Sequence, residues 1–227
     1  MKILVAGPSQ CGKSSYIQFL DDKAINIDSK TRTGIKTTVG LDFGAKKIEA
    51  LQILLFGTPG LLRFSIIRKI LAEGSDGVIF IFDATNPVND EKGITILNEI
   101  RSAIPSNTPI IFLANKSDLP NARKPEVIRT QNYIPRKYKF FPTSTKSGMN
   151  VVESLEYLVK TEILENWREL ISILSKYETN IEGLAEKMQK DIGHIKGFLF
   201  LLEVKGLISF NYKDMTYNVN EEIKNLI

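Results

Sequence analysis

Short apolar runs alternate with amphipathic stretches through the first 160 or so residues. Five segments are apolar over most of their length, as expected of strands buried on both faces of a sheet. Between them, apolar residues recur at helical spacing, which predicts helices. Alternating strands and helices indicate an α/β fold, with a mostly parallel sheet and helices on both faces. The predicted buried strands are 2–7, 51–57, 77–84, 109–115 and 139–144.

The segment 44–49 comes shortly before the predicted strand 51–57. Two strands so close along the chain form a hairpin, so we expect one antiparallel edge strand in the sheet.

From about residue 161 the pattern changes, and no further buried strand is predicted. Three amphipathic stretches predict helices, and an alternating segment around "NYKD" predicts a hairpin. Helices followed by a hairpin are typical of a small winged-helix module. We therefore expect two domains, 1–163 and 164–227, without a Pro/Gly-rich linker between them. The predicted C-terminal elements are helices 165–178, 181–188 and 192–206 and the hairpin 207–220.

The segment "GPSQCGKSS" lies between the first predicted strand and the first predicted helix. Its Gly, Lys and Ser positions fit the phosphate-loop pattern G-x-x-x-x-G-K-[ST]. Backbone N–H groups of such a loop surround phosphates, which needs Gly where a Cβ would intrude. The Lys brings a positive charge to the phosphates, and the Ser hydroxyl at the helix N-terminus can bind Mg²⁺. The predicted nucleotide contacts of this loop are Gly7, Gln10, Cys11, Gly12, Lys13, Ser14 and Ser15.

Cys11 is the one cysteine of the 227 residues, which excludes a disulfide framework and a cysteine-based metal site. Inside the loop it fits a tolerated small residue, and a redox-regulated loop is the alternative. Composition, with 43% hydrophobic and 25% charged residues, is that of a soluble globular protein. Because we find no membrane span, prenylation site or myristoylation site, we expect a cytoplasmic protein that a partner or a basic patch would bring to any membrane.

The tetrapeptide "NKSD" (115–118) follows the predicted strand 109–115, at the sheet edge where ligands of open α/β sheets bind. An Asp carboxylate accepts from both the ring N–H and the exocyclic amine of guanine, and adenine offers no such pair of donors. We therefore predict that Asp118 selects guanine. The Lys116 stem would cover the base with its charge in water, and Asn115 would tie this loop to the phosphate loop.

The segment "TSTKSG" (143–148) ends the last predicted strand. Backbone N–H groups of Ser144 and Thr145 are candidates for binding the guanine carbonyl, and Lys146 for packing beside the base. A plain turn rich in Ser and Thr is the alternative.

These three motifs, in this order and at these distances, resemble those of Ras/Rab-type small GTPases, which are P-loop NTPases. The segment "KTTVGLDFG" (36–44) is similar to the Rab-type effector segment, and Thr38 stands where that family has its switch-one threonine. The resemblance implies a GDP/GTP switch with a six-stranded sheet, and Mg²⁺ held by Ser14 and Thr38. It also implies effector, exchange and activating proteins that bind segments 34–44 and 57–69.

The stretch "FGTPGLLRF" (56–64) departs from the family pattern D-T-A-G-Q-E-R-F. Gly57 lacks a carboxylate that would hold a water on Mg²⁺. We predict that Asp83, which ends the neighbouring strand, supplies it, and a strand-end cap is the alternative role. Gly60 keeps a backbone N–H that can contact a γ-phosphate. We therefore predict that Lys13, Thr38 and Gly60 are the catalytic residues at the γ-phosphate.

Leu61 stands where the family has a Gln that orients the attacking water. Since Leu has no donor or acceptor, we expect intrinsic hydrolysis to be slower by about 3 kcal/mol, on the order of a hundredfold. Leu61 and Leu62 are expected to form an exposed apolar pair that docks a partner or the C-terminal module. The nearby cations Arg63, Arg68 and Lys69 are interpreted as solvated helix charges, with a catalytic role as the alternative.

Residues 161–227 hold 8 Lys and Arg against 11 Asp and Glu, a balance of −3, and residues 1–160 carry +7. DNA binding depends largely on Lys and Arg that neutralise phosphates. The C-terminal module is therefore predicted to bind a protein partner or to dimerise, with DNA as the less favoured partner. Taken together, the sequence predicts a small GTP-binding switch with slow hydrolysis that signals through its winged helix. The alternatives are a non-hydrolysing scaffold bound to guanine nucleotide and a nucleotide-gated DNA-binding regulator.

Overall fold

The computed structural model describes residues 1–25, 28–30, 36–38, 41–178 and 180–225, with 28–30 and 36–38 described by their backbone alone. The chain divides into two compact units. One unit contains Lys2–Lys46 and Leu54–Val159, and the other contains Met1, Lys47–Ile53 and Lys160–Ile227.

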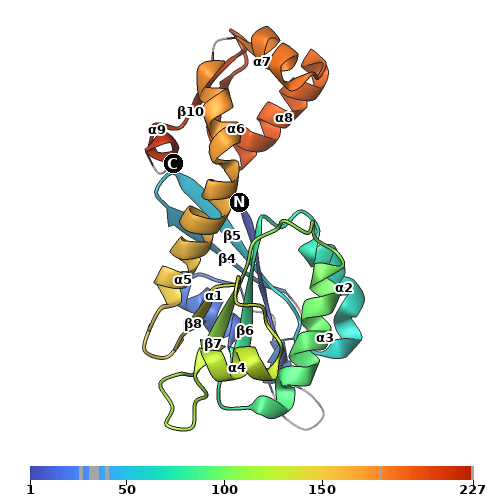
Figure 1. Ribbon diagram of the computed structural model, residues 1–227, viewed down its shortest axis with the longest axis vertical. Helices are drawn as coiled ribbons and strands as arrows, with labels where there is room; N and C mark the ends of the chain where they lie inside the picture. Colours follow the sequence, from blue (N-terminus) through green and yellow to red (C-terminus); the bar gives the residue numbers. More distant parts are fainter. Residues whose placement is uncertain (26–27, 31–35, 39–40, 179, 226–227) are drawn as a thin grey trace. The chain divides into compact units, whose positions relative to one another are not determined.

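The first unit is built on a six-stranded sheet in the order β4-β5-β1-β6-β7-β8 (Figure 1). β1 pairs in parallel with β5 and β6, and β7 pairs in parallel with β6 and β8. Because two residues join β4 to β5, these neighbouring strands run antiparallel, as in a hairpin. The predicted mostly parallel sheet with one antiparallel edge strand is thus confirmed. Its strands are β1 (Lys2–Ala6), β4 (Asp42–Ile48), β5 (Leu51–Gly57), β6 (Gly77–Asp83), β7 (Ile110–Asn115) and β8 (Phe140–Pro142).

Every residue of the central strands β6 and β7 is buried, which explains their continuous apolar sequence. On one face, Phe80, Phe82 and Phe112 pack in a cluster with buried side chains of α2 (Ser65–Ala72), α3 (Asp90–Arg101) and α4 (Pro125–Gln131). Figure 1 shows α2 and α3 together on one side of the sheet, with α1 (Lys13–Leu20) and α5 (Val151–Tyr157) on the other. Helices on both faces close the core, and the loops at the carboxyl ends of the strands are left to form the site.

Short elements complete this unit. The two-stranded sheet of β2 (Asp28–Lys30) and β3 (Lys36–Thr38) is antiparallel, and two 3₁₀ turns, η1 (Leu62–Phe64) and η2 (Pro87–Asn89), precede α2 and α3.

The C-terminal elements follow the predicted order of helices and a hairpin. A π-helical segment, Leu158–Ile163, leads from α5 directly into α6 (Leu164–Lys176), as expected for a chain without a linker. The side chains of Asn180 and Asp191 accept hydrogen bonds from N–H groups in the first turns of α7 and α8. The remaining elements are α7 (Ile181–Met188), α8 (Ile192–Val204), β9 (Ile208–Asn211), β10 (Thr216–Val219) and α9 (Glu221–Lys224).

A buried tyrosine fastens the hairpin to the first helix of this unit. The Tyr217 hydroxyl on β10 donates to the Leu174 carbonyl oxygen of α6 at 2.9 Å. β9 and β10 pair antiparallel, and α9 was not predicted. In the part of the chain that the structure describes, no helix has the length and apolar character needed to cross a bilayer.

Candidate nucleotide-binding site

The loop between β1 and α1 has two glycines whose conformation and surroundings exclude a side chain. Gly7 and Gly12 have φ angles of 146° and 104°, in the region that favours glycine. A Cβ on Gly7 would lie 2.3 Å from the Ile81 carbonyl oxygen, and one on Gly12 would lie 2.1 Å from Nδ2 of Asn115. The loop therefore takes the tight turn that a phosphate cradle needs.

Lys13 lies inside this loop, 5% exposed, and its Nζ donates to the Pro8 carbonyl oxygen at 2.7 Å. Gly60 packs against this loop and belongs to the segment 57–69, which we call the second switch. A Cβ on Gly60 would come within 2.6 Å of the Ser9 nitrogen and 2.8 Å of Lys13 Nζ. The structure thus brings Lys13 and Gly60 together, as their predicted shared action on a γ-phosphate requires.

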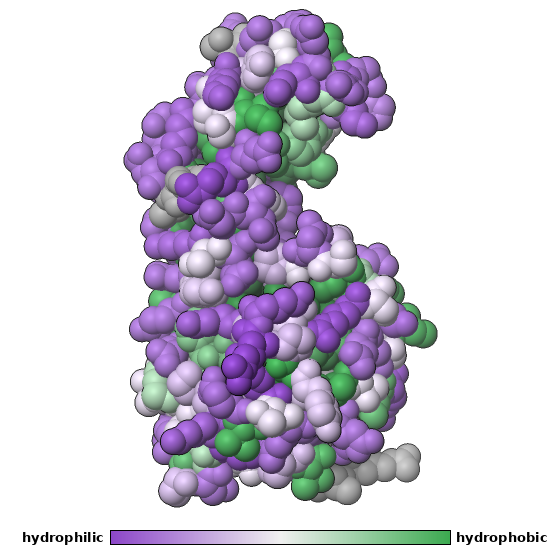
Figure 2. Space-filling view, viewed as in Figure 1, coloured by the Kyte–Doolittle hydropathy of each residue, from purple (hydrophilic) through white to green (hydrophobic). Residues whose placement is uncertain are grey.

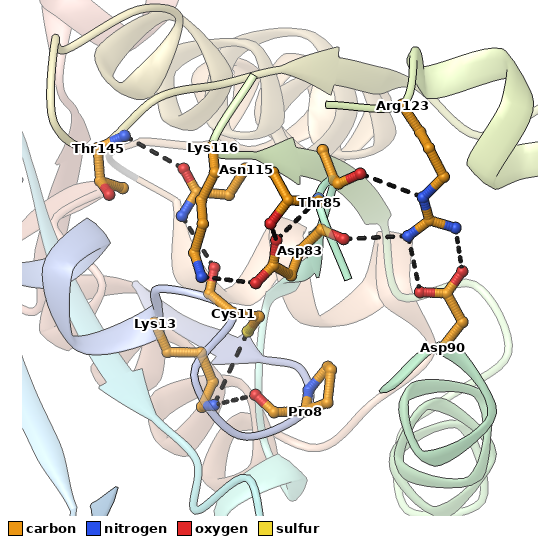
Figure 3. A network of polar contacts seen from close by, with 11 residues as sticks. Pro8, Cys11, Lys13, Asp83, Thr85, Asp90, Asn115, Lys116, Arg123 and Thr145 are labelled. Carbon is orange, nitrogen blue, oxygen red and sulfur yellow. Dashed lines mark hydrogen bonds and ion pairs between the residues drawn. The ribbon is translucent and has the colours of Figure 1, made fainter. Parts of the chain in front are cut away.

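Asn115 connects the phosphate loop to both segments predicted to hold the base. Its Nδ2 donates to the Cys11 carbonyl oxygen at 2.8 Å, and its Oδ1 accepts from the Thr145 N–H at 3.1 Å (Figure 3). Its side chain is almost fully buried, so these hydrogen bonds form away from water. The predicted tie between the loops is therefore present, and it extends to the 143–148 segment.

Asp83 lies at the end of β6 and faces Lys116, not the start of α1 (Figure 3). Its Oδ2 accepts from Lys116 Nζ at 2.5 Å, and its Oδ1 accepts from the Thr85 hydroxyl and N–H. Burial alone would raise the pKa of Asp83, but the hydrogen bonds from Lys116 and Thr85 outweigh it and lower that pKa. The Lys116 ammonium, expected in water, is therefore ion-paired in the structure.

An arginine that the sequence analysis did not single out holds the same strand end. Arg123 donates to the backbone carbonyl oxygens of Asp83 and Ala84 and forms an ion pair of 2.6 Å with Asp90 (Figure 3). It anchors the chain after "NKSD" to β6. An Arg in a loop gives no sequence signal of such a role, because its backbone acceptors and Asp90 lie more than 30 residues away along the chain.

The 143–148 segment uses its N–H groups differently from the prediction. The Ser144 N–H donates to the Met149 carbonyl oxygen at 3.1 Å, and the Thr145 N–H donates to Asn115. A guanine carbonyl would have to share these donors. Gly148, with φ 84°, packs against the Phe19 ring, since a Cβ there would lie 2.6 Å from the ring edge.

The hydroxyl of Ser14 meets a carboxylate that sequence analysis did not predict. Ser14 Oγ donates to Oδ2 of Asp42 at 2.7 Å, and Asp42, on β4, has no exposed surface. Gly57 on β5 lies beside it, and a Cβ on Gly57 would be 2.9 Å from that same carboxylate oxygen. Asp42 belongs to the segment "KTTVGLDFG" (36–44), but only the folded structure shows that its carboxylate meets Ser14.

The interpretation of Arg68 as a solvated helix charge is wrong, because its side chain is fully buried. Its five N–H donors are all used. Two bind Glu99 of α3, at 2.9 and 2.6 Å, and three bind backbone carbonyl oxygens of the second switch. Those acceptors belong to Pro59, Leu61 and Leu62, at 3.0, 2.6 and 3.0 Å.

Other predicted residues lie around this site with less defined roles. The Thr38 side chain lies outside the described residues, as do parts of the 34–44 segment. Leu62 is 43% exposed and Leu61 is half-buried, so the expected pair is only partly exposed. The exposed predicted contacts are Gln10, Ser15, Asp118 and Lys146, with Arg63 and Lys69 exposed on the second switch.

Comparison with known proteins agrees with this geometry. The Ras family model matches residues 2–164. The chain is 34% identical over 182 residues to the Ras-related protein Rab-32C of Dictyostelium discoideum, covering 74% of this chain and 75% of that protein. It is 27% identical to the GTP-binding protein ypt4 of Schizosaccharomyces pombe, over 72% of this chain and 71% of that protein. The chain therefore belongs to the Ras family of small GTPases.

Proposed function

We propose that this chain is a guanine-nucleotide switch that binds GTP and GDP with Mg²⁺ and hydrolyses GTP slowly. The observation that carries the proposal is the Asn115 amide, which joins the phosphate loop to the 143–148 segment through two hydrogen bonds. That arrangement supports the proposal of a phosphate cradle and a base-binding edge at the carboxyl ends of neighbouring strands. Asp118 is the proposed guanine-selecting residue in this site.

The oxygen donors near the helix N-terminus suit Mg²⁺. Ser14 presents a hydroxyl there and Asp42 a buried carboxylate, both hard oxygen groups of the kind that Mg²⁺ prefers. Mg²⁺ held there would neutralise negative charge that develops on the phosphate oxygens during hydrolysis. Ser14 and Thr38 are the proposed protein ligands, whereas the Asp83 carboxylate predicted from sequence binds Lys116 and Thr85.

Slow hydrolysis is proposed because Leu61 offers no group to orient water. The Leu61 carbonyl oxygen accepts from buried Arg68 at 2.6 Å, so the backbone at this position is held in place. The backbone that would carry a longer polar side chain at position 61 is therefore already held in place.

Single-turnover hydrolysis of GTP, measured with Mg²⁺, tests this step. Leu61→Gln should raise the rate by roughly ten- to a hundredfold, because it restores an amide that can align water. Leu62→Gln is the matched control, since it adds the same amide one residue away and should leave the rate unchanged. Equal rates for Leu61→Gln and the unchanged chain would refute the account of Leu61.

A non-hydrolysing scaffold is the second candidate, favoured by the loss of two polar side chains at Gly57 and Leu61. A long single-turnover incubation of the chain with GTP at warm temperature distinguishes the slow switch from the scaffold. Complete retention of GTP would support the scaffold, and slow conversion to GDP would support the switch.

We infer that the C-terminal elements form a winged-helix module that binds a protein partner or a second copy. Apolar side chains of α8 are exposed, with Phe200, Leu201 and Val204 between 54% and 66% exposed. The face shown in Figure 2 is mostly hydrophilic, with apolar surface gathered in separate areas. Effector, exchange and activating proteins are proposed to bind segments 34–44 and 57–69, and a cytoplasmic location stays a prediction.

DNA binding is the less favoured role for this module, given its charge balance of −3 over residues 161–227. A salt-dependent mobility shift with duplex DNA would support it. Absence of binding near 50 mM salt would remove it, because phosphate contacts are strongest at low salt.

A further inference from the structure

We propose that Asp42 on β4 replaces the carboxylate that Gly57 lacks, so that the metal-organising acid has moved to the neighbouring strand. The inference rests on the proposed nucleotide function and deepens it, because it names the acid that supports Mg²⁺ at Ser14. It assigns a positioning role to a residue of the effector segment.

The space beside Gly57 is filled by Asp42. A Cβ on Gly57 would lie 2.8 Å from the Asp42 Cβ and 2.9 Å from its Oδ2, closer than real Cβ atoms approach. A side chain at position 57 would therefore require the Asp42 side chain to shift from the position it has here. The carboxyl group of Asp42 occupies the volume into which an acid at position 57 would begin to project.

The carboxylate is also joined to the phosphate loop. Oδ2 of Asp42 accepts from Ser14 Oγ at 2.7 Å, and Asp42 is fully buried beside Ile17 and Gly57. A buried anion at this distance orients the Ser hydroxyl and gives the site a negative charge that favours a divalent cation. Removing the carboxylate charge should therefore weaken the binding of Mg²⁺ more than it weakens the binding of the nucleotide itself.

Asp83 does not have this relation to Ser14 among the described contacts. Its two oxygens bind Lys116 and Thr85, on the side of the site where the base loop begins. Asp83 supports the base-binding segment, and Asp42 supports the helix N-terminus. Removing the Asp42 carboxylate should therefore change how GDP release depends on Mg²⁺, whereas removing the Asp83 carboxylate should not.

The test is the release rate of fluorescently labelled GDP from the full chain, measured against Mg²⁺ concentration and in EDTA. Asp42→Asn keeps the shape of the side chain and removes its charge. It should raise the Mg²⁺ concentration that half-maximally slows release by roughly 10- to 100-fold, the usual effect of losing a group that supports metal ligands. Its release rate in EDTA should equal that of the unchanged chain.

Asp83→Asn is the matched control, because it removes a second buried carboxylate that lies on another strand. It should speed release by the same factor with and without Mg²⁺, and leave the half-maximal Mg²⁺ concentration unchanged. If Asp83→Asn shifts the Mg²⁺ dependence and Asp42→Asn does not, the assignment to Asp42 is overturned.

An exchange variant keeps the test decisive if Asp42→Asn does not fold. Asp42→Gly with Gly57→Asp returns the acid to β5 and removes the Cβ that would collide with it. It should recover the Mg²⁺ dependence to within about threefold, whereas Gly57→Asp alone should unfold at a lower temperature than the unchanged chain. An exchange variant that binds GDP without any Mg²⁺ dependence contradicts the inference. Failure of the unchanged chain to bind GDP at all would instead refute the proposed function.

Discussion

At the scale of single residues, the reactivity of the Cys11 thiol reports whether the phosphate loop is closed and packed. Cys11 is fully buried, and burial raises the pKa of its thiol, although nearby Lys13 acts in the opposite direction. Since the thiolate is the reactive form, alkylation by iodoacetamide at pH 8 should be at least about 100-fold slower in the folded chain than in urea. Labelling at the unfolded rate would contradict the buried loop and would favour the redox-regulated alternative.

Asp83 makes a prediction about acid stability. Its pKa is lowered below the ordinary value of 3.8, because the hydrogen bonds from Lys116 and Thr85 outweigh the opposing effect of burial. A carboxyl with a lowered folded pKa stabilises the fold above its unfolded pKa, and that contribution is lost as the pH falls through the folded pKa.

Urea unfolding midpoints measured from about pH 6 to about pH 2.5 check this point. The unchanged chain should lose stability below about pH 4 more steeply than Asp83→Asn. Asp118→Asn, which removes an exposed acid two residues from Lys116, is the control for the loss of one carboxylate. Parallel curves for Asp83→Asn and the unchanged chain would show that the ion pair with Lys116 does not form.

At the scale of elements, the second switch depends on Arg68. The guanidinium joins three switch carbonyl oxygens to Glu99 of α3 from a fully buried position. Arg68→Ala leaves these carbonyls and Glu99 without their partner, and it should lower the free energy of unfolding by about 3–5 kcal/mol.

Lys69→Ala is the control for this helix, because Lys69 is the exposed neighbour. It should change the free energy of unfolding by less than about 0.5 kcal/mol. Chemical denaturation of both variants measures the difference, and an equal, small effect would mean that Arg68 does not organise the switch.

The elements differ in how far the sequence could predict them. The strands β6 and β7 are buried along their whole length, so continuous apolar runs revealed them. Gly7 and Gly12 were predictable because their spacing from Lys13 is fixed by the loop. Asp42 was not, because its partner Ser14 lies on α1 and no sequence pattern shows that the start of α1 meets the start of β4. Arg68 looked like a surface charge, since its carbonyl acceptors have no sequence pattern.

At the scale of the whole molecule, all predicted nucleotide contacts come from the part of the chain that the Ras family model matches. The Ras family match ends at residue 164, and none of the predicted nucleotide contacts lies in 164–227. The chain 1–163 should therefore bind GDP within roughly tenfold of the full chain, a difference of about 1.4 kcal/mol.

The same truncation should lower the melting temperature. Residues 47–53 belong to the compact unit that contains 160–227, and Glu49 forms an ion pair of 2.7 Å with Lys160. Calorimetry of the shortened chain would measure this loss. A folded 1–163 chain that no longer binds GDP would contradict the predicted division into domains.

Competition between GDP and ADP for the full chain, with Mg²⁺ present, tests the central claim most directly. A site built to pair Asp118 with the guanine N–H groups should favour GDP over ADP by roughly 10⁴-fold. The account predicts that labelled GDP is displaced by unlabelled GDP at stoichiometric concentration and resists millimolar ADP. Equal displacement by the two nucleotides, or no binding of GDP, would contradict the identification of a guanine-nucleotide switch.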